Sequence, residues 1–110
     1  MARYKIIRST VNYQFYFRFV ADNGKQIISS EGYTTKENCK NGISAVQSRS
    51  PYDGTYQRHD AVGNYRFNML STNGQIIARS SEGYVNRQDR EHAIDIMKRQ
   101  GGSAGTDDLT

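Results

Sequence analysis

The sequence predicts an α+β fold in which two tandem β(3)-α(-β) repeats form one antiparallel sheet, with two helices on one face and a pseudo-twofold relation between the halves. The segment Ser-Ser-Glu-Gly-Tyr occurs at residues 29–33 and again at 80–84, and an Asn-Gly pair precedes each copy, at 23–24 and 73–74. In each copy the apolar residues first alternate, as in a strand, and then take helical spacing.

Strands open each copy. The first is expected at about residues 4–8, and its counterpart at 56–59. The second strand of each copy alternates apolar and polar residues, so its apolar side chains share one face of the sheet and should form the core. The residues assigned to that face are Phe15, Phe17 and Phe19 in the first copy and Tyr65, Phe67 and Met69 in the second.

The Asn-Gly pairs predict hairpins. Both residue types tolerate the positive φ of a type I′ turn. The chain should therefore turn at 23–24 and 73–74 into third strands at Ile27-Ile28 and Ile76-Ile77.

The spacing of apolar residues becomes helical after each Glu-Gly-Tyr. Thr34 and Glu37 read as a capping box at the start of the first helix. Residues 85–89 open the second helix. The expected core faces of the two helices are Cys39, Ile43 and Val46, and Ala93, Ile94 and Met97.

A single domain over residues 1–110 follows, with repeat 1 at about 4–50 and repeat 2 at about 54–100. Pro51 separates the copies, and the glycine-rich residues 101–105 are expected to be flexible.

The duplicated motif is interpreted as structural. Glycine permits a turn from strand to helix, the carboxylates lie near helix N-termini, and the tyrosine rings pack beneath them. The residues of this motif are Asn23, Gly24, Glu31, Gly32, Tyr33, Asn73, Gly74, Glu82, Gly83 and Tyr84.

The order of an aromatic strand, an Asn-Gly hairpin, Ile-Ile, Ser-Glu-Gly-Tyr and a helix containing Asn41-Gly42-Ile43 resembles the YegP-like family of small prokaryotic proteins. The resemblance covers residues 4 to about 98. It implies one antiparallel sheet with helices on one face and exchanged C-terminal strands, of which Asp108-Leu109-Thr110 would be one. The second helix departs from the pattern with His92-Ala93-Ile94. The family is functionally uncharacterised, so the resemblance implies a fold and no activity.

The charge balance is basic. Lys and Arg number 15 against 11 acidic residues, for a net charge of +4. Such a charge suits an anionic partner, either protein or nucleic acid, and equally serves solubility alone. The single cysteine excludes an internal disulfide, and no apolar signal core or membrane span is present. A cytoplasmic protein without a membrane partner is expected.

Candidate catalytic residues are few. His59-Asp60 would need the imidazole and carboxylate to meet, yet neighbours on a strand point to opposite faces. Cys39 shares the apolar side of its helix, which favours a buried thiol over a nucleophile. No nucleophile, phosphate-loop or metalloprotease motif is present, and no metal or cofactor is expected.

The open face of the sheet is the candidate binding surface. The residues expected there are Tyr16, Arg18, Asn64, Arg66 and Asn68, joined by Lys5 and Gln57 from the first strands. The leading hypothesis is a non-enzymatic interaction module that uses this face. The alternatives are RNA or single-stranded DNA binding through the same side chains, and a small enzyme acting through Cys39 or His59.

A monomer is expected in solution, because a duplicated unit satisfies internally what a single repeat would obtain by dimerising. Light scattering should give the mass of one chain. A tight dimer at low micromolar concentration would contradict this expectation.

Overall fold

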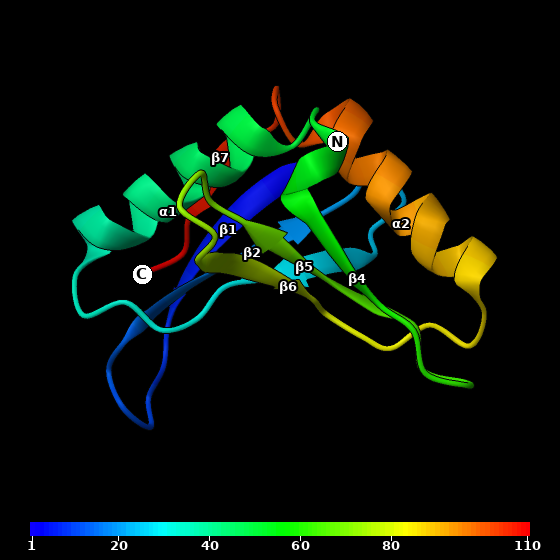
Figure 1. The fold of residues 1–110 in the computed structure, drawn as a ribbon. Helices are drawn as coiled ribbons and strands as arrows, with labels where there is room; N and C mark the ends of the chain where they lie inside the picture. Colours follow the sequence, from blue (N-terminus) through cyan, green and yellow to red (C-terminus); the bar gives the residue numbers. More distant parts are fainter.

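Alternating apolar residues build a sheet whose buried face lies under two amphipathic helices. The computed structural model describes all residues, 1–110. Figure 1 shows both helices on the same side of the sheet. Neither helix is long and apolar enough to cross a membrane. The elements are β1 (Arg3–Arg8), β2 (Phe15–Val20), β3 (Gln26–Ser29), α1 (Lys36–Arg49), the short 3₁₀ turn η1 (Asp53–Thr55), β4 (Tyr56–His59), β5 (Arg66–Leu70), β6 (Ile76–Ser80), α2 (Arg87–Gln100) and β7 (Gly105–Asp108).

The strand order confirms the duplicated α+β fold. The seven strands run β4-β5-β6-β3-β2-β1-β7. Each half contributes three consecutive antiparallel strands, and the halves meet where β3 pairs with β6. A pseudo-twofold axis therefore passes between β3 and β6. The sheet is mostly rather than wholly antiparallel, because β7 pairs with β1 in parallel.

The C-terminal strand lies earlier than expected. It covers Gly105–Asp108, whereas 108–110 was the expected segment. Residues 101–105 are not a loose connection, since Gly101 closes α2 with its amide on the Met97 carbonyl and Ala104 is buried. Pairing with β1, more than 90 residues away in sequence, fixes this segment in place.

The hairpins differ in type from the prediction. Only the glycines, Gly24 and Gly74, have positive φ, at 83° and 84°, so the turns are not type I′. The Asn23 carboxamide oxygen accepts the Lys25 amide at 2.9 Å, which holds a local asparagine turn. The ladder then shifts between Phe19 and Val20, as expected when glycine forms a bulge after a turn.

Strand pairing also corrects the alignment of the repeats. The Ser30 hydroxyl accepts the Phe17 amide at 2.9 Å, and the Ser80 hydroxyl accepts the Phe67 amide at 3.3 Å. Ser80 is therefore the counterpart of Ser30, although the repeated motif aligns it with Ser29. The counterpart of Ser29 is Arg79, and these two residues pair directly across the axis.

The helices begin one residue later than the capping box implied. Thr35, not Thr34, is the N-cap of α1, and its hydroxyl accepts the Asn38 amide at 3.1 Å. Asn86 caps α2 in the same way. Counting from these caps, the position of Cys39 in α1 is occupied in α2 by Arg90, which is only 2% exposed.

Glycine in the repeated motif has a packing role. A Cβ on Gly32 would lie 2.0 Å from the Gln14 side chain, and a Cβ on Gly83 would lie 1.7 Å from that of Asn64. Neither glycine has positive φ. These positions require glycine because a neighbouring side chain approaches closely, and not because the backbone turn is strained.

The core lies between the sheet and the helices, as the alternation predicted. Phe17 and Phe67 occupy matched central positions and are fully buried. Tyr4 meets Phe19 edge-on at 4.9 Å between ring centroids, and Tyr56 meets Phe67 in the same manner at 5.8 Å. Edge-to-face aromatic pairs give each half its own packed centre.

Removal of either central ring should leave a large cavity. Phe17→Ala or Phe67→Ala is expected to lower the free energy of unfolding by about 3 to 5 kcal/mol. Val62→Ala, at a fully exposed position, is the matched control and should change it by less than about 0.5 kcal/mol. Urea denaturation measures both; a loss below about 1 kcal/mol for both phenylalanine variants would contradict the packing described.

Candidate functional site

One line of side chains crosses the whole sheet on the face away from the helices. Strand pairing places each member opposite the next, so residues from both halves lie in register. From the β7 edge to the β4 edge the row is Asp107, Lys5, Arg18, Ser29, Arg79, Asn68 and Gln57. The row therefore has cations at its centre and a single carboxylate at one end. We call this set the cross-strand row.

Arg18 is an unpaired cation of the row. Its side chain is exposed and forms no hydrogen bond or ion pair within the chain. It borders a hollow of about 550 Å³ together with Tyr16 and Ser29. The Tyr16 hydroxyl accepts the Asn12 side-chain amide at 3.0 Å, so the ring is held in position beside the guanidinium.

A second hollow, of about 410 Å³, lies across Ser29 from the first. Its walls are Ser29, His59, Arg66, Asn68, Arg79 and Ser80, with no apolar side chain and no carboxylate among them. Because Ser29 borders both hollows, a small residue at the centre of the row joins them into one depression.

The side chains of the second hollow are tied to one another. Arg66 donates from Nε to the Asn64 carboxamide oxygen at 3.0 Å. The Asn68 side-chain amide lies 3.1 Å from His59 Nε2 and 3.3 Å from the Gln57 carboxamide oxygen. Arg79 forms an ion pair with Glu31 at 2.7 Å.

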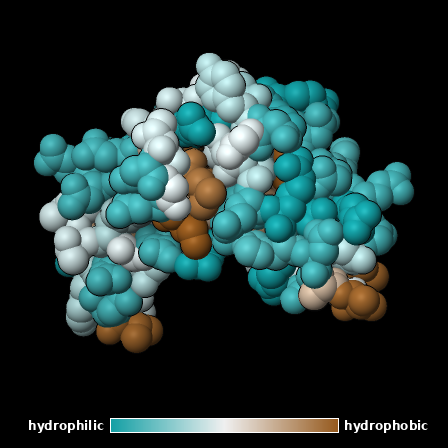
Figure 2. All heavy atoms as spheres, viewed as in Figure 1, coloured by the Kyte–Doolittle hydropathy of each residue, from teal (hydrophilic) through white to brown (hydrophobic).

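The open face is also concave. The loop between β1 and β2 and the loop between β4 and β5 project at opposite ends, on the side away from the helices (Figure 1). Figure 2 shows the molecule hollowed between these projections, with apolar atoms at their tips. The exposed valines of the loops are Val11 and Val62.

The structure distributes the expected site residues over two places. Tyr16 and Arg18 lie in the first hollow, whereas Arg66 and Asn68 lie in the second. Two strands, β3 and β6, separate Arg18 from Arg66, a span of roughly 14 Å. Asn64 packs over Gly83 and orients Arg66, so its role is supportive.

Sequence reasoning missed Ser29 and Arg79, which occupy the centre of the row. Aligning the repeats by identity matched Ser29 with Ser80 and left Arg79 without a counterpart. Alternation along β6 was the available signal, because Ala78 is buried and its neighbour Arg79 must therefore point to the other face.

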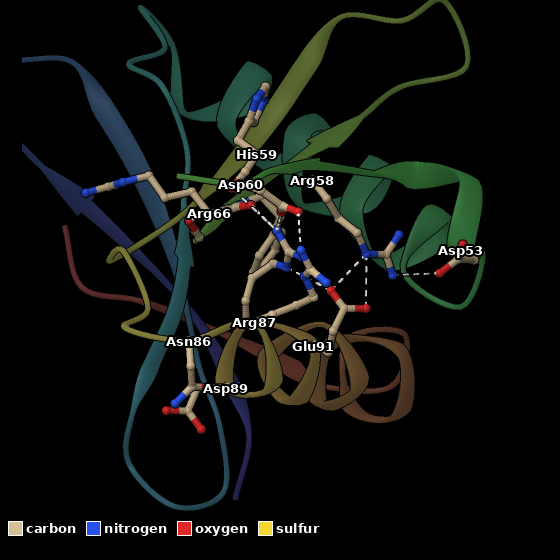
Figure 3. Close-up of polar contacts among 12 residues, drawn as sticks. Asp53, Arg58, His59, Asp60, Arg66, Asn86, Arg87, Asp89 and Glu91 are labelled. Atoms are coloured by element: carbon tan, nitrogen blue, oxygen red, sulfur yellow. Dashed lines mark hydrogen bonds and ion pairs between the residues drawn. The ribbon is translucent and has the colours of Figure 1, made fainter. Parts of the chain in front are cut away.

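Asp60 does not serve His59. Its carboxylate turns to the helix side, where it contacts Arg90 and lies 3.2 Å from Arg87 (Figure 3). Bonding to Arg90 holds the pKa of Asp60 below its usual value. The imidazole and carboxylate thus belong to different faces of the sheet, although β4 ends at His59.

Ion pairs continue from Asp60 along the helix side of the second half. The buried Arg90 donates to Glu91 at 2.8 Å, and Glu91 also accepts from Arg58 at 2.9 Å. Asp53 joins Arg58 to Lys98 at 2.9 and 2.7 Å, and hydrogen bonds from both lower its pKa to about 2. We call this chain of charges the helix-side network; it neutralises the cations that it contains.

Cys39 is fully buried on the core-facing side of α1. Burial raises the pKa of its thiol to about 11, which leaves almost no thiolate at neutral pH. No group of three or more His, Cys, Asp or Glu side chains is arranged to hold a metal ion.

Comparison with known proteins gives one consistent result. A family model described as "Domain of unknown function (DUF1508)" matches the chain twice, over residues 11–57 and 60–108. The UPF0339 protein YegP of Escherichia coli K12 is 38% identical over 108 residues, spanning 97% of this chain and 96% of YegP. A UPF0339 protein of Bordetella pertussis is 37% identical over 100% of this chain and 98% of its own length.

Two solved structures are similar throughout. The solution NMR structure of UPF0339 protein SO3888 from Shewanella oneidensis gives a TM-score of 0.91 at 34% identity, covering 99% of this chain and 92% of that one. The NMR structure of E. coli yegP, described as a protein of unknown function, gives 0.89 at 36% identity, covering 99% and 93%. The paired family matches agree with the duplicated fold.

Thiol chemistry tests the position of Cys39. In the folded protein at pH 8, the reaction of Cys39 with a disulfide reagent should be on the order of 100-fold slower than in urea, because burial removes both access and thiolate. A Val62→Cys variant supplies an exposed thiol as the control. Reaction of the native thiol at the rate of the control would show that Cys39 is accessible.

Proposed function

This chain belongs to the DUF1508 family, which is described only as a domain of unknown function. We therefore propose its function from its surface alone. The protein is a non-enzymatic interaction module that binds an anionic partner across the open face of its sheet. The cross-strand row is the observation that carries the proposal. A partner lying along the row would meet residues of both halves at once.

The distribution of ion pairs supports an anionic partner. In the second half, Arg58, Arg87, Arg90 and Lys98 all contact carboxylates of the helix-side network. On the open face, Arg18 and Arg66 have no carboxylate partner. Unpaired guanidinium groups are the ones available to a ligand, since they lose no internal ion pair on binding.

The concavity of the face supports an elongated ligand. The two hollows form one depression that runs across the strands, and the loops at its ends project beyond it. A chain-like polyanion would follow this path, whereas a flat protein surface would be held away by the loops.

The positions of the reactive residues support a non-enzymatic role. Cys39 is buried on the helix side with a raised pKa, and His59 is bonded to neutral amides without a carboxylate. General acid–base catalysis would require a base in reach of an activated group in the hollow.

Single-stranded nucleic acid is the partner class that one observation favours over an acidic protein. The Tyr16 ring lies in the same hollow as Arg18. Aromatic rings stack on bases of any sequence while cations follow the phosphates. An acidic protein would use the cations and leave the ring without a role.

Charge removal on the open face tests the proposal. The double variant Arg18→Gln with Arg66→Gln should bind a decamer of uridine or thymidine at least about tenfold more weakly than the unmodified protein at low salt. Loss of two phosphate contacts should also lower the slope of log K against log salt by about 1.4. Fluorescence anisotropy at several salt concentrations measures both quantities.

The control is Lys25→Gln with Lys40→Gln, which removes the same charge from exposed positions outside the row. Poly-glutamate serves as the protein-like polyanion. If the unmodified protein binds none of these polyanions, the proposal fails; if both double variants bind equally, the open face is the wrong site. Preference for poly-glutamate over either decamer would exclude nucleic acid as the favoured partner.

A further inference from the structure

We propose that the second hollow of the open face is a phosphate-binding site. The inference rests on the proposed function, because it names the chemical group that one part of the open face receives. The site is formed by Ser29, His59, Arg66, Asn68, Arg79 and Ser80.

Two guanidinium groups supply the charge. Arg66 uses only its Nε, on Asn64, and leaves both Nη groups without a partner. Arg79 uses only one Nη, on Glu31, and leaves its Nε and the other Nη. Arg66 therefore retains the fork of its two Nη groups, the arrangement that matches two oxygens of one phosphate, and Arg79 retains separate N–H donors beside its ion pair.

Neutral polar side chains complete the site, and Ser29 supplies the free donor among them. The Ser29 hydroxyl has no partner within the chain. Ser80 also borders the hollow, but it is only 5% exposed and its oxygen accepts the Phe67 amide. Asn68 is fixed at the wall by the bonds of its side-chain NH2 group to Gln57 and His59, which use both of its hydrogens.

The balance of charge in the hollow is positive. No carboxylate lines it, and the acid that contacts its walls, Glu31, balances one of the two arginines. A site with surplus positive charge and a hydroxyl donor favours an oxyanion over a neutral polar group.

Comparison across the pseudo-twofold axis shows that the site belongs to one half only. Strand pairing makes Tyr16 the counterpart of Arg66, and Arg18 the counterpart of Asn68. Ile7 stands in the place of His59. The first hollow thus combines an aromatic ring and an aliphatic side chain with two cations, Arg18 and an Arg8 whose guanidinium lies over the Tyr13 and Phe15 rings. The second has two cations and no apolar group. A phosphate would select the second hollow.

The phosphate can be a small monoester or the backbone of a nucleic acid, and the same chemistry receives both. The first test uses inorganic phosphate on the unmodified protein, at constant ionic strength maintained with chloride. Two-dimensional NMR should show saturable shifts of the Asn68 side-chain amide and of the backbone amides of Ser29, Arg79 and Ser80. Resonances of α1 should not move.

Three variants test the residues. Arg79→Gln and Asn68→Asp should each weaken phosphate binding at least about tenfold, the first by loss of a cation and the second by a new negative charge in the hollow. Glu31→Gln frees Arg79 and should strengthen binding roughly threefold. Lys25→Gln with Lys40→Gln is again the control and should stay within about twofold.

Two further ligands show whether the bound phosphate belongs to a small ester or to a nucleic-acid backbone. Adenosine monophosphate presents a monoester, and a thymidine decamer without terminal phosphate presents only diesters. Saturation of the same resonances by both assigns the site to backbone phosphate as well; saturation by the monophosphate alone assigns it to small phosphate esters.

Absence of saturable shifts with inorganic phosphate would overturn the inference, as would equal binding by the unmodified protein, Arg79→Gln and Asn68→Asp. Failure of the proposed polyanion binding can be distinguished from failure of the phosphate site, because the protein would then still respond to inorganic phosphate. Conversely, the protein could bind the decamer through Arg18 and show no response to inorganic phosphate. That result would support the proposed interaction module and contradict the phosphate site.

Discussion

The pairing of β3 with β6 joins the two halves, with Ile28 opposite Ser80 and Ser29 opposite Arg79. Without it, each half would be a three-stranded sheet with one helix and an unpaired central edge, which is costly in exposed backbone groups. With it, both helices cover the same face, and the opposite face becomes continuous from β4 to β1. The cross-strand row exists only because this junction brings the two halves into register.

The halves share a backbone plan and differ in how their interiors are filled. Where the first half has Ile6 and Cys39, the second has Arg58 and Arg90. Arg90 is almost fully buried, so its charge must be compensated, and Asp60 and Glu91 provide this. Bonding to the arginines lowers the pKa values of both acids. The acids of this region are thus committed to the helix side, and Arg18 and Arg66 on the open face have no carboxylate partner.

This partition explains why a small excess of positive charge can be concentrated. A net charge of +4 spread evenly would mean little. Here Arg58, Arg87, Arg90 and Lys98 all contact carboxylates of the helix-side network. Arg18 and Arg66 stay free on the other face. The chemical asymmetry of the two hollows then arises from single substitutions between equivalent positions, such as Tyr16 and Arg66.

Local patterns predicted what depends on local geometry. Alternation placed Phe17 and Phe67 in the core, because side chains of a strand reverse face at each residue. The predicted type I′ turn was wrong, since the Asn23 side chain accepts the amide of Lys25, two residues further on. The predicted N-cap, Thr34, was also wrong, because the adjacent Thr35 caps α1. Two features lay beyond sequence reasoning. The parallel pairing of β7 with β1 is non-local, and the central place of Arg79 depends on a register that identity between the repeats conceals.

Native-state hydrogen exchange at the junction tests whether the two halves form one cooperative sheet. The Ser81 amide donates to the Ile27 carbonyl across the junction, whereas the Ser30 amide donates to Phe17 within the first half. If the junction holds one cooperative sheet together, both amides should exchange only through global unfolding, with equal free energies that fall together in dilute denaturant. Exchange of the Ser81 amide through a lower-energy opening that leaves the Ser30 amide protected would show that the halves separate while folded, and would contradict the continuous face on which the account depends.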